Sequence, residues 1–313
     1  MIEWRIILTD GLNEVGQAIL RAAARVEDRN DISPEDLLKE VADYDAMIVR
    51  GRTIVTPEVF DAARRLKVVG RAGVGVDNIN LTAASAHGIT VVNAPVSTSL
   101  AVAELTLGLM LALAREIPYA DARMKAGQWV KNQIEGIELN GKTLGVMGMG
   151  NIGSAVSQRA AALGMQVIGY DPLIPADKIS QHGAEPVSLP NLYARSDFIT
   201  LHLPLTDETR GMINEQVLGQ MKRGVRLVCT ARGGMIDETA LLSALDSGQV
   251  AAVALDVYAK EPPGLTALIA HPQVIATPHI GAQTAEAQAH AATDIASEVL
   301  NALNGQPLRW KIV

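Results

Sequence analysis

Residues 142–171 contain a glycine pattern that restricts the fold more than any other stretch of this chain. Gly148, Gly150 and Gly153 follow an apolar run and open a segment with helical spacing, in the order G-x-G-x-x-G. Glycines at these positions allow a tight strand-to-helix turn, a close approach of backbone to phosphate, and close packing of helix on strand. The pattern predicts a βαβ unit that binds a dinucleotide, with an ordinary βαβ turn without ligand as the alternative.

Asp171 stands at the end of the next apolar run, where the second strand of such a unit ends. A carboxylate there accepts hydrogen bonds from ribose hydroxyls and repels a 2′-phosphate. No arginine adjoins it in Tyr170-Asp171-Pro172 to neutralise that phosphate. The expected cofactor is therefore NAD rather than NADP.

Composition limits the class of protein further. A chain of 313 residues exceeds the usual size of a single core, so two domains are expected. A net charge of −7 and an aromatic content of 3% disfavour nucleic acid and anionic membranes as partners. The single cysteine, Cys229, excludes an intrachain disulfide and fits a reducing compartment.

The chain start and the longest apolar segment both indicate a cytoplasmic protein. Met1-Ile2-Glu3 has an acid where a secretory signal carries basic residues. The apolar segment 100–114 includes Glu104 and is shorter than a bilayer requires. We expect this segment to form a long helix that is buried or lies at an interface.

Strand and helix signals alternate along the chain, which predicts parallel sheets covered by helices on both faces. Helices are expected at 15–25, from Ser33-Pro34 onward, and at 99–116 and 285–303. Strands are expected at 5–9, 46–49, 67–70, 90–92, 198–203, 225–230, 250–255 and 274–276. The predicted domains are 1–98 with 285–313, and a dinucleotide domain at 99–284.

Three polar residues follow apolar strands in the second half of the chain, namely Arg232, Glu261 and His279. Ligands of open α/β sheets bind beyond the carboxyl ends of strands, so the three could share one site. A guanidinium fork binds a carboxylate, and an imidazole can protonate the oxygen of a 2-keto acid that receives hydride. A carboxylate beside that imidazole favours its charged form. Singly, they could instead be a solvated loop residue, a surface charge and a core histidine.

Several longer segments stand in order along nearly the whole chain: RAGVGVDNIN (71–80), NAPVSTSLAVAEL (93–105), LNGKTLGVMGMGNIG (139–153), HLPLTDETRGMIN (202–214), ARGGMIDE (231–238), ALDVYAKEPP (254–263) and TPHIGAQTAEAQ (277–288). Together they resemble the D-isomer-specific 2-hydroxyacid dehydrogenase family, and most closely its short D-3-phosphoglycerate dehydrogenases without a regulatory C-terminal domain. The resemblance implies a Rossmann NAD domain inserted into a flavodoxin-like substrate domain, with a cleft between them. It also implies a homodimer with the helix near 100–114 at the interface.

The resemblance implies a role for each matching residue. Arg232 would bind the substrate carboxylate and keto oxygen, His279 would be the acid/base, and Glu261 its charged partner. Cofactor contacts would come from Gly148, Gly150, Asn151, Ile152, Gly153, Asp171, Thr230, Asp256 and His279. Substrate contacts would come from Arg50, Gly73, Val74, Gly75, Thr98, Arg232 and Gln288. No metal is expected.

The resemblance leaves the substrate least defined. It implies NAD-dependent oxidation of a small D-2-hydroxy acid, with 3-phosphoglycerate, a precursor of serine, as the leading candidate. Gly51 and Thr98 depart from the phosphoglycerate pattern of serine and asparagine, whereas Arg50 and Gln288 keep it and Arg52 adds a cation. Alternatives are hydroxypyruvate or glyoxylate reduction, a sulfolactate-type substrate, and a non-enzymatic NAD-sensing corepressor.

Overall fold

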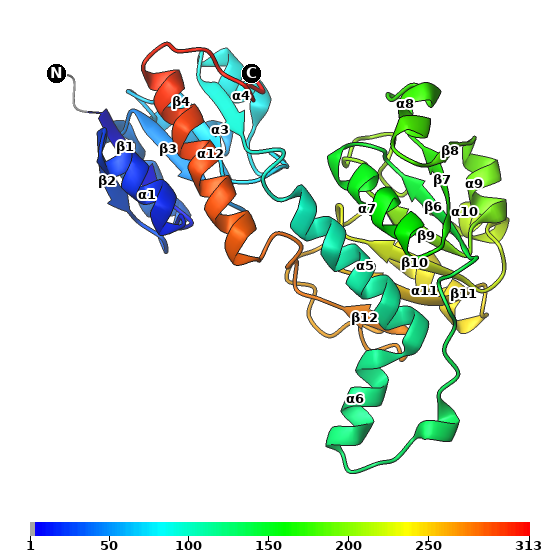
Figure 1. Ribbon diagram of the computed structural model, residues 1–313. Coiled ribbons are helices and arrows are strands. Elements are labelled where there is room, and N and C mark those ends of the chain that lie inside the picture. The colour runs from blue at the N-terminus through cyan, green and yellow to red at the C-terminus, as the bar shows by residue number, and fades with distance from the viewer. Residues whose placement is uncertain (1–3) are drawn as a thin grey trace. The chain divides into compact units, whose positions relative to one another are not determined.

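The computed structural model describes residues 4–313, which form two compact units (Figure 1). The first unit consists of the chain up to Thr98 together with Ala282–Val313, and the second of Ser99–Gly281. Met1, Ile2 and Glu3, on which the expectation about a secretory signal depends, lie outside the described residues. Among the helices of residues 4–313, none combines the length and apolarity needed to cross a membrane.

The first unit contains a five-stranded parallel sheet. Its strands are β1 (Trp4–Leu8), β2 (Ala24–Asp28), β3 (Ala46–Val49), β4 (Val68–Arg71) and β5 (Thr90–Asn93). Their spatial order is β2-β1-β3-β4-β5, which is the flavodoxin-like order. The direction of strand addition reverses between β1 and β3, so the carboxyl ends of these two strands flank the position where such sheets bind ligands.

Helices cover both faces of this sheet. They are α1 (Glu14–Arg21), α2 (Pro34–Glu40), α3 (Pro57–Ala62), α4 (Leu81–Ala86) and α12 (Ala285–Leu303), with a 3-10 turn η1 (Val41–Asp43). The Ser33 hydroxyl accepts the Asp36 N–H at the start of α2, as the sequence signal Ser33-Pro34 predicts. The last helix, α12, lies along α1 and packs on β4, so the end of the chain completes the first unit (Figure 1).

One predicted helix is wrong at its end. The helix expected over 15–25 stops at Arg21, and Ala24–Asp28 forms the edge strand β2. Ala24 and Val26 alternate with the charged residues Arg25 and Glu27, but two small apolar side chains are too few to mark a strand within a segment that continues the helical pattern. Its pairing with β1 overrides the local helical preference.

The second unit contains a seven-stranded parallel sheet. Its strands are β6 (Thr143–Met147), β7 (Gln166–Tyr170), β8 (Glu185–Pro186), β9 (Phe198–Leu201), β10 (Val225–Cys229), β11 (Val250–Leu255) and β12 (Val274–Ala276). The order β12-β11-β10-β9-β6-β7-β8 reverses between β6 and β9, as in dinucleotide-binding doubly wound sheets. Successive residues of one strand serve opposite cores, because Leu227 joins one apolar cluster and Val228 the other.

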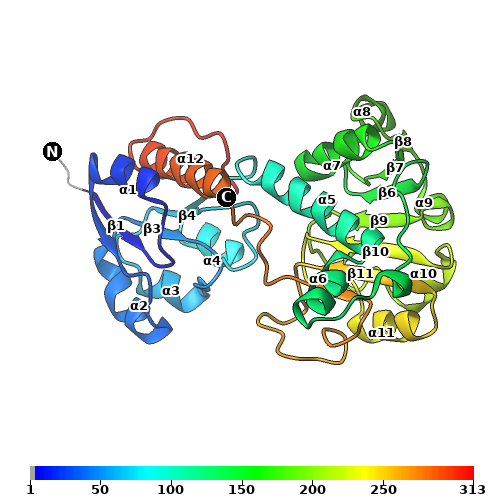
Figure 2. The ribbon, with the colours of Figure 1, turned by 60° about the horizontal axis from the view of Figure 1, so that its bottom comes forward.

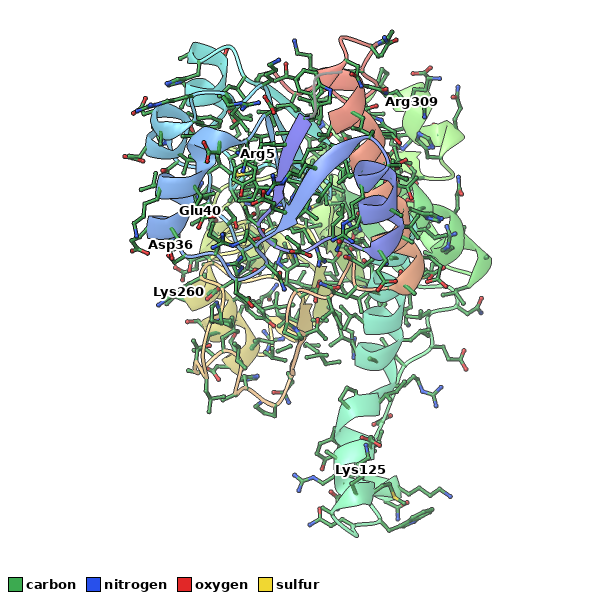
Figure 3. The ribbon with its side chains drawn as sticks, turned by 90° about the vertical axis from the view of Figure 1, so that its left-hand side faces the viewer. Arg5, Asp36, Glu40, Lys125, Lys260 and Arg309 are labelled. Atoms are coloured by element: carbon green, nitrogen blue, oxygen red, sulfur yellow. The ribbon has the colours of Figure 1, made fainter. Side chains whose placement is uncertain are left out.

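The helices of the second unit pack on those two faces. They are α5 (Ser99–Arg115), α6 (Ile117–Lys125), α7 (Asn151–Ala162), α8 (Ala176–Gln181), α9 (Leu189–Arg195), α10 (Glu215–Gln220) and α11 (Glu238–Asp246), with a 3-10 turn η2 (Lys131–Gln133). The predicted long helix is α5, which packs on α7, β10 and β11 (Figure 2). By contrast, α6 has no buried residue and projects from its own sheet as an arm that carries Lys125 (Figures 1 and 3).

Candidate active site

The glycine loop joins β6 to α7 in the second unit. Gly148 has a φ of 94°, and a Cβ there would lie 2.7 Å from the His202 carbonyl oxygen. A Cβ on Gly153 would collide with the Gly148 carbonyl oxygen, so helix and strand can approach only because both residues are glycine. At Gly150 a Cβ would meet nothing within 4 Å. The loop is therefore tight on its protein side and open on the other.

The amino end of α7 faces the open side of this loop. Gly150 precedes the helix without a side-chain cap, and Asn151 and Ile152 form its first turn. First-turn N–H groups have no partner within the helix, and the helix dipole makes this end positive. Such an end binds phosphate without further side chains.

Asp171 follows β7 and holds the glycine loop. One carboxylate oxygen accepts the Met149 N–H at 2.8 Å, and the other accepts those of Leu173 and Ile174 at 2.8 and 3.1 Å. A carboxylate offers about four acceptor positions. Asp171 can therefore fix the loop and still accept a bond from a ribose hydroxyl.

His279 and Glu261 are brought into contact. His279 Nδ1 and Glu261 Oε2 lie 2.7 Å apart, and the side chains are 49% and 37% exposed. Burial by itself would raise the pKa of Glu261, but the hydrogen bond and charge of His279, the Tyr258 N–H and the charge of Arg232 lower it below its ordinary value. Glu261 thus stays ionised, orients the imidazole through Nδ1 and leaves Nε2 for a ligand.

Asp256 holds the turn that carries His279. It is fully buried, and its carboxylate accepts the Thr277 hydroxyl at 2.6 Å and the N–H groups of Ile280 and Gly281, both at 2.8 Å. His279 itself has a φ of 52°, a left-handed conformation that costs free energy in a residue other than glycine. The sequence placed Asp256 among cofactor contacts, whereas here its hydrogen bonds fix the His279 backbone.

Arg232 follows β10 and donates from Nη1 to the Ala231 carbonyl at 2.6 Å. The next residue, Gly233, leaves no room for a Cβ, which would collide with the Tyr258 carbonyl oxygen. The arginine loop is therefore packed directly on the loop that ends in Glu261. Arg232, Glu261 and His279 all belong to the second unit, as does Asp171.

The hydroxyl of Thr230, a predicted cofactor contact, is hydrogen-bonded within the protein. Thr230 is buried, and its hydroxyl and that of Thr106 on α5 lie 2.9 Å apart in a hydrogen bond. A cofactor would therefore meet the backbone of Thr230 rather than its hydroxyl.

The residues expected to bind the substrate tail belong to the first unit. Arg50 follows β3, while Gly73, Val74 and Gly75 follow β4. The Gly73 N–H already donates to the Arg71 carbonyl at 2.8 Å, and Asn93 Nδ2 fixes the Val74 carbonyl at 2.6 Å. The N–H groups of Val74 and Gly75 make no hydrogen bond within residues 4–313.

Of two further predicted substrate residues, one is buried and the other already makes a hydrogen bond within the protein. The Thr98 side chain is buried, at 3% exposure. Gln288 donates one Nε2 hydrogen to the Ala282 carbonyl at 2.8 Å, which leaves its second N–H and its side-chain oxygen for a ligand. Within the described part of the chain, no three His, Cys, Asp or Glu residues are grouped to hold a metal ion.

Comparison with known families gives one match to more than half of the chain. Residues 107–281 match the model of the "D-isomer specific 2-hydroxyacid dehydrogenase, NAD binding domain". D-3-phosphoglycerate dehydrogenase 2, chloroplastic, of Arabidopsis thaliana is 50% identical over 96% of this chain and 49% of its own length. D-3-phosphoglycerate dehydrogenase of Methanocaldococcus jannaschii is 48% identical over 96% of this chain and 58% of its own length. The chain thus spans about half the length of the curated relatives it matches.

Two solved structures match over nearly their whole length. A glyoxylate reductase from Paecilomyes thermophila is 31% identical, with a TM-score of 0.91 over 100% of this chain and 99% of that one. D-lactate dehydrogenase of Aquifex aeolicus, complexed with NAD and lactic acid, is 29% identical, with a TM-score of 0.85 over 96% of both chains.

Proposed function

This chain belongs to the D-isomer-specific 2-hydroxyacid dehydrogenases, a family with an NAD-binding domain, and on that premise we propose a reaction and a substrate for it. The reaction is hydride transfer between NAD and C2 of a small D-2-hydroxy acid or its 2-keto acid. The substrate pair is 3-phosphoglycerate and 3-phosphohydroxypyruvate, which serves serine biosynthesis; the relatives named as D-3-phosphoglycerate dehydrogenases support it. The observation that carries the proposal is the 2.7 Å pair of His279 and Glu261.

The second unit fits NAD by its backbone. The open side of Gly150 and the uncapped start of α7 would hold the pyrophosphate, and Asp171 would accept the ribose hydroxyls. When bound, NAD supplies the hydride acceptor or donor. Asn151 and Ile152 would contribute the N–H groups of the first turn.

The proposed work of this chain's own residues is to bind the acid and move one proton. Arg232 binds the substrate carboxylate and directs the C2 oxygen. His279 Nε2 takes the hydroxyl proton in oxidation and returns it in reduction. Glu261 keeps the imidazole oriented and stabilises its charged form.

NADH oxidation over a panel of 2-keto acids tests this function. The panel is 3-phosphohydroxypyruvate, hydroxypyruvate, glyoxylate, pyruvate and sulfopyruvate. We expect the largest kcat/KM with 3-phosphohydroxypyruvate. A higher value with glyoxylate or sulfopyruvate would replace the substrate but keep the reaction, whereas NADH binding without reduction of any keto acid would contradict the enzyme itself.

Replacing Asp171 with asparagine should relax the preference for NADH. The amide oxygen can still accept the Met149 N–H and so hold the glycine loop, although the N–H groups of Leu173 and Ile174 lose their acceptor. The charge that repels a 2′-phosphate is removed. The ratio of kcat/KM with NADH to that with NADPH should fall about tenfold or more, for a loss of about 1.4 kcal/mol of discrimination. An unchanged ratio would contradict the ribose assignment.

Replacing Glu261 with glutamine should change the pH profile of keto-acid reduction. The lowered pKa of Glu261 keeps it charged through neutral pH, and that charge favours the imidazolium that donates the proton. In Glu261→Gln kcat at neutral pH should fall about 10²-fold, and the loss of rate that the wild-type enzyme shows at acid pH as Glu261 is protonated should be absent. The profile measured between pH 3 and 9 decides, and an acid limb that persists in the variant would exclude Glu261 as its source.

A homodimer is also proposed, with the arm formed by α6 and the following turn as its contact. Ile117, Met124 and Trp129 on this arm are 51%, 53% and 78% exposed, whereas α5 is largely buried in its own unit. A second copy of this chain carries the same exposed residues, and a two-fold contact between the arms would bury them on both copies. Trp129→Asp should convert a dimer into a monomer in analytical ultracentrifugation, with fold retained by circular dichroism. A wild-type monomer would refute the dimer.

A cytoplasmic location is proposed on the single thiol of the sequence. Cys229 is the one cysteine of the sequence, so the chain has no intrachain disulfide of the kind that proteins of oxidising compartments often contain.

A further inference from the structure

The turn at 50–53 lies at the carboxyl end of β3, beside the end of β1 where the strand order of the first unit reverses. Asp10, which follows β1, accepts the N–H groups of Arg50 at 2.7 Å and Thr53 at 3.1 Å, as well as the Thr53 hydroxyl. On the other side, Asn78 Nδ2 donates to the Arg50 carbonyl at 3.1 Å and the Thr53 carbonyl at 2.7 Å. The backbone N–H and carbonyl groups of Arg50 and of Thr53 are therefore all hydrogen-bonded, which fixes both ends of the turn.

Arg52 belongs to this scaffold. Its guanidinium lies 3.3 Å from the Asp10 carboxylate and donates to the carbonyls of Thr9, Asn30 and Ile32. The Asp10 side chain is only 4% exposed, so its charge requires this pairing. Arg52, the second cation that the sequence places near the substrate tail, thus already links the 50–53 turn to the loop after β1 and to the loop before α2.

Arg50 is arranged in the opposite way. Its backbone is fixed on both sides, yet its side chain makes no hydrogen bond or ion pair with any residue from 4 to 313. Gly51 beside it is exposed, and a Cβ there would meet nothing within 4 Å. A guanidinium held on a rigid backbone next to open space, at a topological switch point, is suited to an anionic ligand.

We propose that Asp10 is the positioning residue of a preformed anion subsite, in which Arg50 and the Gly51 N–H receive the anionic tail of the substrate while Arg52 serves only as scaffold. The inference rests on the proposed function, because it concerns that enzyme's substrate. The tail it selects is a phosphate or a sulfonate rather than a neutral hydroxymethyl group. Asp10 acts through the 50–53 turn and does not touch the ligand.

The test compares 3-phosphohydroxypyruvate with hydroxypyruvate, which differs by lacking the phosphate. In Asp10→Asn the KM for the phosphorylated keto acid should rise about tenfold with kcat nearly unchanged, and both constants for hydroxypyruvate should stay within about twofold. Sulfopyruvate as a third substrate shows whether a sulfonate is received in the same way. Should Asp10→Asn fail to fold, Asn78→Ala releases the same turn from its other side and should give the same split.

Asp45 provides a matched control. It is also 4% exposed and paired with an arginine, Arg65, but precedes β3 at the opposite end of the strand. Asp45→Asn should cost similar stability and leave both KM values unchanged. A second control is the double variant: if Asp10 acts through Arg50, Asp10→Asn should add nothing in an Arg50→Gln background.

The outcomes distinguish a failure of the subsite from a failure of the proposed function. Equal effects of Asp10→Asn on both substrates, equal effects of Asp45→Asn, or additivity with Arg50→Gln would overturn the subsite. A wild-type preference for phosphorylated substrate that survives Asp10→Asn would overturn the subsite and leave the proposed function standing. A wild-type enzyme that does not prefer an anionic tail would overturn the proposed substrate and the subsite together.

Discussion

Replacing His279 with alanine should lower kcat for keto-acid reduction about 10³-fold, because positioned general acids contribute about 10² to 10⁴ in rate. Within residues 4–313 the His279 side chain makes one hydrogen bond, to Glu261, and His279 follows β12, whereas the glycine loop that would hold the pyrophosphate follows β6. NADH affinity, measured by fluorescence titration, should therefore change less than about twofold. The same drop in the rate of a single turnover would place the loss in the chemical step.

The backbone at His279 requires a control for this variant. Alanine must adopt the same left-handed φ of 52° that Asp256 enforces through the turn. His279→Asn supplies a residue that tolerates this conformation better but cannot donate the proton in the same way. Both variants should be equally slow. A near-normal rate in His279→Asn would show that turn geometry, rather than proton transfer, was lost in alanine.

Much of the architecture could be predicted from the sequence because it is encoded locally. The predicted fold class, family and NAD cofactor are confirmed by the two parallel sheets and by the matches of this chain. Buried parallel strands such as β3 are continuous apolar runs, and α12 begins and ends where its periodicity does. By contrast, α6 buries nothing, so it has no apolar stripe from which to predict it.

The supporting residues of the site could not be predicted, since their partners are distant in sequence. Asp256 holds Gly281, and Asp10 holds Thr53, through contacts that no spacing rule indicates. The sequence shows only that Asp256 and Asp10 are charged residues soon after a buried strand. The same pattern indicated Arg232, so it does not distinguish a supporting residue from one that binds the substrate. The burial of Thr98 could not be predicted from the sequence either, because it depends on residues that are distant along the chain.

Replacing Arg232 with alanine should lower kcat/KM for every keto acid of the panel about 10³-fold, or about 4 kcal/mol of transition-state stabilisation. Its guanidinium would both bind the carboxylate and stabilise charge on the C2 oxygen, and charge-assisted bidentate bonds are the strongest of their kind. Unlike Arg50, it should matter equally for phosphorylated and unphosphorylated substrates, because all of them share the carboxylate. Initial rates with 3-phosphohydroxypyruvate and hydroxypyruvate measure this directly.

Arg232→Lys separates charge from geometry. Lysine keeps the positive charge that helps lower the pKa of Glu261, but it has no planar fork. If bidentate binding is the main contribution, the lysine variant should remain at least about 10²-fold impaired while its pH profile stays close to wild type. Arg223 is a control, because it precedes β10 at the end of the strand opposite to Arg232 and donates to the Ser247 carbonyl. Arg223→Ala should leave kcat/KM unchanged. A lysine variant with near-normal kcat/KM would mean that Arg232 acts as a point charge on the Glu261–His279 pair and does not clamp the carboxylate.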